Sequence, residues 1–247
     1  MTPLDRLCAL PFHEADDAAR AAILRRLADT QLYAALAGDA EGDRAELLRL
    51  DGPDGSLALA CDSDDRLSGF FDQPTPYAAM PGRVLARLLA EAGVALLVNP
   101  GAPSEMLIGA ETLDWLARAL ADHPNAGQDT ARLSPPDAAV AEMLLPALGE
   151  RLAEMAGLAQ AATLTRAQWS DGREGHLVLI EGAESQIEPL IAKAIGELAA
   201  FLPPIQGGLD VSFAALSAPE GAPRIVIKPP PAPPPKPKKE KGPPILR

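Results

Sequence analysis

The sequence has few of the residues from which cross-linked or metal-binding domains are built. Two cysteines, Cys8 and Cys61, are too few for a disulfide framework in a chain of 247 residues. One bridge between them is conceivable, but we expect two reduced thiols. The three histidines are dispersed, and neither a His-Glu-x-x-His nor a Cys-x-x-Cys motif is present. We therefore expect no metal ion and no cofactor.

Long apolar runs are also missing. The longest falls far short of the roughly 20 residues that a membrane-spanning helix needs. Acidic residues at Glu14, Asp16 and Asp17 interrupt the N-terminal region early, which is untypical of a signal peptide. Together with the reduced thiols, these absences predict a soluble, cytoplasmic protein without a transmembrane segment.

Positive charge is scarce. Lysine and arginine number 22 against 34 aspartate and glutamate residues, which gives a net charge of −12. This balance argues against non-specific binding to nucleic acid, because basic charge supplies the affinity there. Hydrophobic residues make up 47% of the chain, which is enough for a sizeable core and excludes disorder throughout the chain.

The C-terminus differs from the rest of the chain in charge and in proline content. Residues 224–247 carry seven basic residues and one acid, a net of +6, which leaves −18 on residues 1–223. Nine of the 26 prolines lie in the same stretch, and proline fixes φ and removes a backbone donor. Residues 229–247 are therefore predicted to form a disordered tail. We expect the tail to make only weak, salt-sensitive electrostatic contacts, through Lys236, Lys238, Lys239 and Lys241.

A cluster of turn residues divides the remaining chain into two halves. It opens with Asp-His-Pro-Asn-Ala-Gly at 122–127 and closes with Ser-Pro-Pro at 134–136. We predict an N-terminal domain over 1–122, a linker over 123–136 and a second domain over 137–228.

Apolar periodicity predicts helices and strands in both halves. In the first half, helices are expected from residue 16 onward and over 82–92 and 110–121, with strands over 31–36, 46–50, 56–61, 94–98 and 105–108. In the second half, helices are expected over 136–156 and 184–202, with strands over 158–169, 176–180, 209–216 and 224–228. Pro146 should kink the first of these helices or start a new one. The predicted fold class is α+β, with two small mixed α/β domains in tandem, each a sheet covered by helices.

Residues 95–104, ALLVNPGAPS, form an apolar strand that ends in an Asn99-Pro100-Gly101 turn. This run resembles the N-terminal domain of the SseB family, in which such a turn precedes a short strand and a helix. The strand over 57–61 resembles the preceding strand-to-helix step, although family members usually carry Phe-Thr-Ser-Glu where this chain has Cys-Asp-Ser-Asp. The second half is similar to the SseB C-terminal domain in the order of its elements. The resemblance implies a bacterial protein linked by name to enhanced serine sensitivity, and it supplies no catalytic residues.

The Asn-Pro-Gly turn is the most specific local feature and the candidate site for a ligand or partner. Asn99 stands at the end of a strand and offers both a donor and an acceptor. The alternative is a purely structural turn, in which Pro100 presets φ and Gly101 supplies a positive φ. Cys61 is a second candidate, as a nucleophile, but no base can be named beside it, so a buried structural thiol is the favoured interpretation.

The acidic run that follows Cys61 is better explained as a helix start than as a calcium loop. Leu67 stands where a calcium loop requires glycine, whereas Ser63 suits an N-cap.

These patterns favour a non-enzymatic protein-interaction or regulatory module that binds an unknown protein partner. Neither phosphate-binding glycine motifs nor a nucleophile elbow is present. The alternative is a small-ligand-binding protein or an enzyme with a pocket near the Asn-Pro-Gly turn. Nucleic-acid binding has only the basic tail in its favour, so no nucleic-acid partner is expected.

Overall fold

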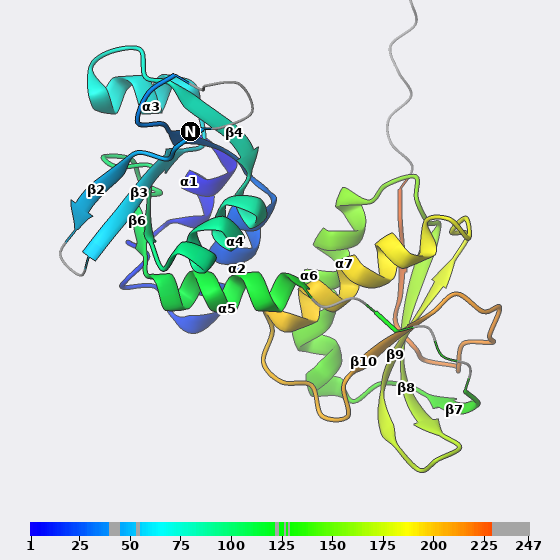
Figure 1. The fold of residues 1–247 in the computed structure, drawn as a ribbon. Helices are drawn as coiled ribbons and strands as arrows, with labels where there is room; N and C mark the ends of the chain where they lie inside the picture. The colour runs from blue at the N-terminus through cyan, green and yellow to red at the C-terminus, as the bar shows by residue number, and fades with distance from the viewer. Residues whose placement is uncertain (40–44, 53–54, 122–123, 126, 128, 229–247) are drawn as a thin grey trace, which may run out of the picture.

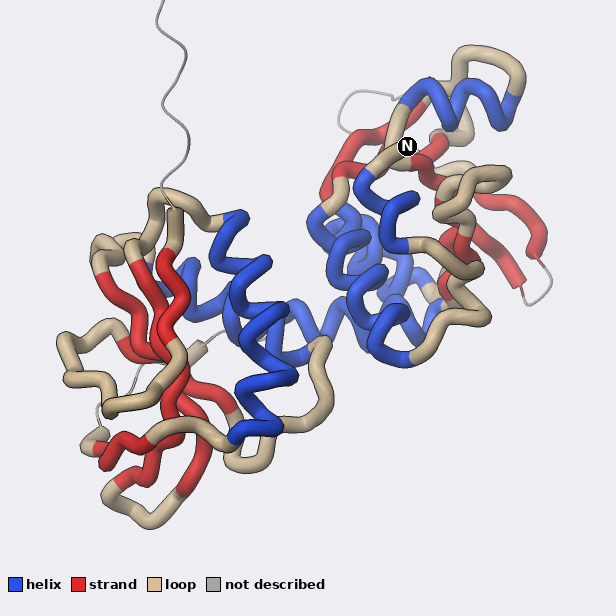
Figure 2. Tube along the Cα trace, turned by 180° about the vertical axis from the view of Figure 1, so that it is seen from behind, coloured by secondary structure: helices blue, strands red, loops and turns tan. Residues whose placement is uncertain are grey.

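A computed structural model of the chain places the helices α2, α4 and α5 of the first half and α6 and α7 of the second half between two sheets, which lie on the outer sides (Figures 1 and 2). The structure describes residues 1–247 except 40–44, 53–54, 122–123, 126, 128 and 229–247. The predicted α+β architecture, a helix-covered sheet in each half, is confirmed. The predicted tail and its four lysines lie outside the described residues.

The first sheet has the strand order β4-β1-β3-β5-β6, with β2 paired to β3. The strands β3 and β5 are parallel, with Ala60 opposite Val98, and the other pairs are antiparallel. Because β3 and β5 run in the same direction, their carboxyl ends meet at one edge of the sheet. The strands are β1 (Gln31–Ala35), β2 (Arg49–Gly52), β3 (Gly55–Cys61), β4 (Tyr77–Pro81), β5 (Ala95–Val98) and β6 (Met106–Ile108).

Helices cover both faces of this sheet. The helices α1 (Pro3–Leu7), α2 (Asp17–Asp29), α4 (Gly82–Ala92) and α5 (Ala110–Ala121) pack around the main core, whereas α3 (Asp64–Phe71) packs Leu67 against the opposite face. The helix α4 lies so close to α2 that a Cβ at Gly82 would stand 2.0 Å from the carbonyl oxygen of Leu27. Only glycine fits at this first position of α4.

The second sheet has the order β10-β9-β8-β11, and β7 pairs with the remaining length of β8. Only β10 and β9 are parallel among these pairs. The helices α6 (Ala138–Glu154) and α7 (Glu188–Ala200) pack on one face through a core that includes Leu144, Leu148, Ile191 and Ile195. The strands are β7 (Ala131–Ser134), β8 (Ala161–Trp169), β9 (Glu174–Glu181), β10 (Leu209–Ser212) and β11 (Arg224–Val226).

The helix α6 runs through Pro146 as one element, which excludes the start of a new helix, one of the two alternatives expected there. One strand of the second half was not expected. The predicted linker 123–136 contains β7, which pairs with β8 and packs Leu133 beside Trp169. The sequence did not predict this short strand for two reasons. Turn residues surround it, and its pairing partner β8 lies more than thirty positions away along the chain.

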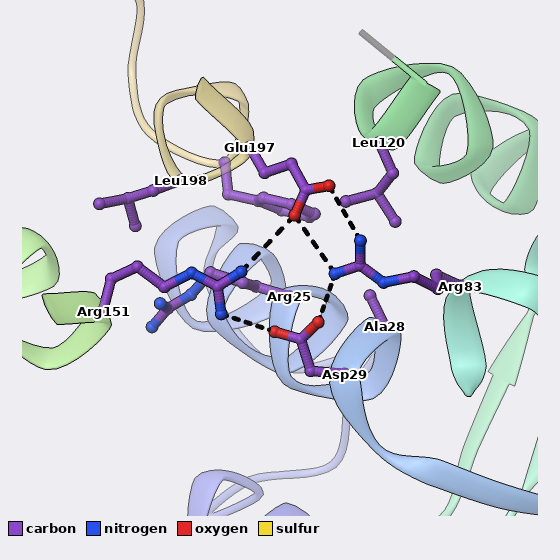
Figure 3. A pocket seen from close by; sticks show the side chains of 9 residues that line it. Arg25, Ala28, Asp29, Arg83, Leu120, Arg151, Glu197 and Leu198 are labelled. Carbon is purple, nitrogen blue, oxygen red and sulfur yellow. Dashed lines mark hydrogen bonds and ion pairs between the residues drawn. The ribbon is translucent and has the colours of Figure 1, made fainter. Parts of the chain in front are cut away.

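The two halves have separate cores, and a charged junction joins them (Figure 3). From the first half come Asp29 at the end of α2 and Arg83 at the start of α4. Arg151 of α6 and Glu197 of α7 come from the second half. Arg83 donates to both Glu197 oxygens at 2.9 and 3.2 Å and is paired with Asp29, while Arg151 lies 2.9 Å from Asp29 and 3.5 Å from Glu197.

Apolar packing closes the same junction. Phe201, just after α7, belongs to the core of the first half and meets Trp115 of α5 edge to face at 5.5 Å. The hollow lined by the four charged side chains and by Phe201, Leu120 and Leu198 has no room for a water molecule. The junction is therefore a packed contact rather than a ligand site.

Replacing Glu197 by alanine should weaken this junction. The Glu197 side chain is 7% exposed and neutralises Arg83 and Arg151, so its loss leaves two guanidinium groups short of a partner. We expect Glu197→Ala to lower the free energy of unfolding by about 2–3 kcal/mol in urea titrations. The matched control is Glu142→Ala, at an exposed glutamate of α6, which should change stability by less than about 0.5 kcal/mol. Equal effects of the two variants would contradict the role assigned to Glu197.

Candidate functional site

Asn99 joins the carboxyl ends of the two parallel strands in the first sheet. Its backbone N–H donates to the carbonyl oxygen of Ala60 at 3.0 Å, and its side-chain oxygen accepts from the backbone N–H of Asp62 at 2.8 Å. The residue is fully buried. The structure thus joins the ends of β3 and β5 at the Asn-Pro-Gly turn, near which the sequence predicted a pocket.

The Asn-Pro-Gly segment forms a hydrogen-bonded turn. The N–H of Ala102 donates to the carbonyl oxygen of Asn99 at 3.1 Å. Gly101 has φ +77°, as the turn interpretation predicted, and a Cβ there would meet no atom within 4 Å. Glycine is needed at this position for its backbone conformation alone. Asn99 itself has φ +48°, a region that asparagine tolerates better than most residues.

The side chain of Asn99 is the first member of a buried polar network. Its amide nitrogen donates to the Ser104 hydroxyl at 2.9 Å, and that hydroxyl donates to Asp5 of α1 at 2.6 Å. Arg66 of α3 donates to both Asp5 oxygens at 2.6 and 3.2 Å and to Asp62 at 2.9 Å. The network therefore ties α1, α3 and the turn to the carboxyl edge of the sheet.

Burial and pairing shift the ionisation of the groups at this edge. Hydrogen bonds from Arg66, and then from Ser104 and the Thr2 backbone, hold the pKa of Asp5 well below its usual value, although burial opposes them. Burial, reinforced by the nearby charge of Asp62, raises the pKa of Cys61 to about 11. The Cys61 thiol therefore stays protonated at neutral pH, which suits a structural residue and not a nucleophile. Both cysteines are free, as expected.

The sequence identified Asn99 but missed its partners Asp5, Arg66 and Ser104. Two local signals were available. Thr2 and Asp5 form a capping box at the start of α1, and Asp62 and Arg66 are spaced by four residues. No local pattern shows that α1 and α3 meet at the Asn-Pro-Gly turn.

An open groove of about 620 Å³ lies beside this network. Residues 8–13 form one wall, and Leu97, Ala102, Pro103, Glu105, Met106 and Leu107 form the other. Leu10 is 56% exposed and Leu107 is 44% exposed. Asn99, Pro100 and Gly101 are not among the residues that line it, so the groove neighbours the predicted site without containing it.

Comparison with known proteins identifies part of the chain. Residues 9–115 match the family model described as the SseB protein N-terminal domain. The match ends before the second half, where an SseB-like C-terminal domain stays a prediction. No curated protein and no solved structure matches the chain. Among the described residues, no helix combines the length and the apolar character needed to cross a membrane, and no three histidine, cysteine or acidic side chains are grouped to hold a metal ion.

Substitutions at Asn99 should separate its hydrogen bonds from its backbone conformation. Asn99→Ala removes the acceptor for Asp62 and the donor to Ser104, and it places alanine at a positive φ, so we expect unfolding to become easier by about 2–4 kcal/mol. Asn99→Gly loses the same hydrogen bonds without the backbone strain and should be about 1 kcal/mol less damaging. Denaturant titrations measure both. Wild-type stability in Asn99→Ala would refute the structural role of the side chain.

The stability of the protein should depend on the ionisation of Asp5. A carboxyl group whose pKa is lower in the folded than in the unfolded state stabilises the fold fully above its unfolded pKa of about 4, and this contribution is lost as the pH falls through the folded pKa. We therefore expect the wild type to lose unfolding free energy more steeply than Asp5→Asn between about pH 5 and about pH 2. Urea titrations at each pH measure the free energy of unfolding of both proteins. If the wild type and Asp5→Asn showed the same dependence of this free energy on pH, the prediction would be contradicted.

Proposed function

The chain has the N-terminal domain of the SseB family over residues 9–115, and we propose on this basis that it acts as a non-enzymatic protein-interaction or regulatory module. The proposed docking surface is the groove between residues 8–13 and β6. The link to serine sensitivity that the family name implies belongs to the same proposal, as does a bacterial, cytoplasmic setting, which suits two buried reduced thiols.

The observation that carries the proposal is the contrast between the groove and the polar edge beside it. The polar side chains of Asn99, Ser104 and Asp5 bond to one another and are buried. The groove instead exposes apolar groups, which include the large side chains of Leu10 and Leu107. A reactive pocket needs convergent polar groups that face a substrate, whereas exposed apolar side chains gathered along one groove are typical of a docking surface.

The chemistry of the groove favours an extended partner segment that carries apolar side chains and positive charge. The strand β6 is the last strand of its sheet, so one side of its backbone is open to strand addition within the described part of the chain. Exposed Glu105 lies on one wall, Glu14 follows the other, and no lysine or arginine lines the groove. Residues 1–223 carry −18 overall, which adds a field that attracts basic segments.

Small-ligand binding, including catalysis, is the second candidate. It is favoured by the groove volume of about 620 Å³, which lies within the range of small-molecule pockets. The two candidates differ in the ligand that the groove accepts. An extended peptide needs the edge of β6 and both walls, whereas a compact ligand needs only part of the groove.

Two peptides of seven residues, one alternating valine with lysine and one alternating valine with glutamate, test the proposal. We expect the lysine peptide to shift the backbone NMR signals of residues 9–13 and 105–108 and the glutamate peptide to shift neither. Leu107→Asp should lower affinity for the lysine peptide at least about tenfold by removing apolar contact. Leu190→Asp, at a leucine of α7 that is 55% exposed, serves as the control and should bind like the wild type. Equal binding of both peptides, or no effect of Leu107→Asp, would overturn the proposed docking surface.

A further inference from the structure

The carboxylate of Asp5 is held in the way that proteins hold a bound carboxylate ligand. Arg66 donates to its two oxygens at 2.6 and 3.2 Å, and the Ser104 hydroxyl donates at 2.6 Å. The backbone N–H of Thr2, the N-cap of α1, adds a contact at 2.8 Å. A fork of two guanidinium N–H groups with a hydroxyl donor beside it is a geometry that selects carboxylates.

The groups that bind Asp5 are positioned by contacts that do not involve Asp5. Asp62, which lies just before α3 and four residues before Arg66, accepts from Arg66 at 2.9 Å. Asn99 donates to Ser104 at 2.9 Å and is itself fixed to the backbone of Asp62 at 2.8 Å. Removal of Asp5 would therefore leave a preformed donor set. Arg66 remains 24% exposed, which gives solvent a path to it.

One polar atom beside this donor set has no partner. The second carboxylate oxygen of Asp62 is buried and makes no hydrogen bond, and the Asp62 side chain is only 3% exposed. Buried carboxylate oxygens are normally satisfied. The edge of the sheet thus retains an unused acceptor next to Arg66, which a ligand with a donor group could satisfy.

Asp5 itself belongs to a short helix. The helix α1 has five residues, and because helices this short have little stability of their own, its place depends on its buried side chains. Leu4 and Asp5 are its buried side chains. The segment that follows, residues 8–13, forms one wall of the groove.

From these contacts we propose that Arg66 and Ser104 form a binding site for a small organic carboxylate, and that Asp5 is the internal ligand that occupies it. An external carboxylate takes the place of Asp5 by accepting from the two guanidinium N–H groups of Arg66 and from the Ser104 hydroxyl, and α1 is then released. We further propose that the release of α1 reshapes the groove wall and so regulates docking, and this step rests on the proposed function. The carboxylate site itself does not rest on the proposed function.

Chemical rescue of Asp5→Ala in the full chain tests the site, with sodium acetate as the probe. Because a ligand that binds only the folded state raises its stability, acetate should raise the Tm of Asp5→Ala in a saturable manner, by about 3 °C or more at ten times its Kd. Sodium chloride at equal ionic strength should not do so. Asp5→Ala/Arg66→Met should lose the response to acetate. An identical response to the two salts, or an unchanged response in the double variant, would overturn the site.

A second measurement keeps the proposal testable if Asp5→Ala does not fold. Asp5→Asn preserves the shape of the side chain without its charge, and the same acetate titration applies to it. In the wild type, acetate should speed amide hydrogen exchange in residues 3–8, and chloride should not. If amide exchange of residues 3–8 in the wild type did not change at acetate concentrations that saturate the Asp5 variant, displacement of Asp5 by acetate would be contradicted. Failure of the lysine peptide to bind the groove would leave these results unaffected, so the two proposals fail separately.

Discussion

The ion pair between Arg66 and Asp5 determines how the carboxyl edge of the first sheet is closed. The side chain of Asp5 is 1% exposed, and such a carboxylate is tolerated only when a cation and further donors neutralise it. Arg66 supplies the charge and Ser104 supplies a hydroxyl, while Asn99 holds Ser104 in place. The N-terminal helix, the Asn-Pro-Gly turn and α3 are therefore parts of one polar assembly. The pair is the contact that attaches α1 to α3, and the Ser104 hydroxyl attaches α1 to the turn.

The junction between the halves shows the same use of arginine. Arg83 and Arg151 lie among Asp29 and Glu197, and these four side chains form ion pairs between the two halves (Figure 3). The two arginines and two acids of the junction balance in charge, so the net charge of −18 on residues 1–223 lies on the other side chains. This excess of acids is the physical reason for expecting basic partners at the groove.

Much of the fold could be predicted from the sequence, because strong local patterns decide it. The helices Gly82–Ala92 and Ala110–Ala121 have the predicted bounds, and Gly93 ends the first of them at φ +64°. The strands β4 and β7 were missed, because they are short edge strands whose stability comes from partners distant along the chain. The turn at Asn99 was predicted, but its buried network was not, since Asp5, Arg66 and Ser104 meet only in the folded chain.

A double-mutant cycle between Asp5 and Asn99 tests most directly whether these contacts act as one assembly. The two side chains are linked through Ser104, which bonds to both. If the network is cooperative, the effects of Asp5→Asn and Asn99→Ala on the free energy of unfolding should differ from additivity by about 0.5 kcal/mol or more. Additive effects, within about 0.3 kcal/mol, would show that the pair and the turn are independent, and would contradict the account given for this edge.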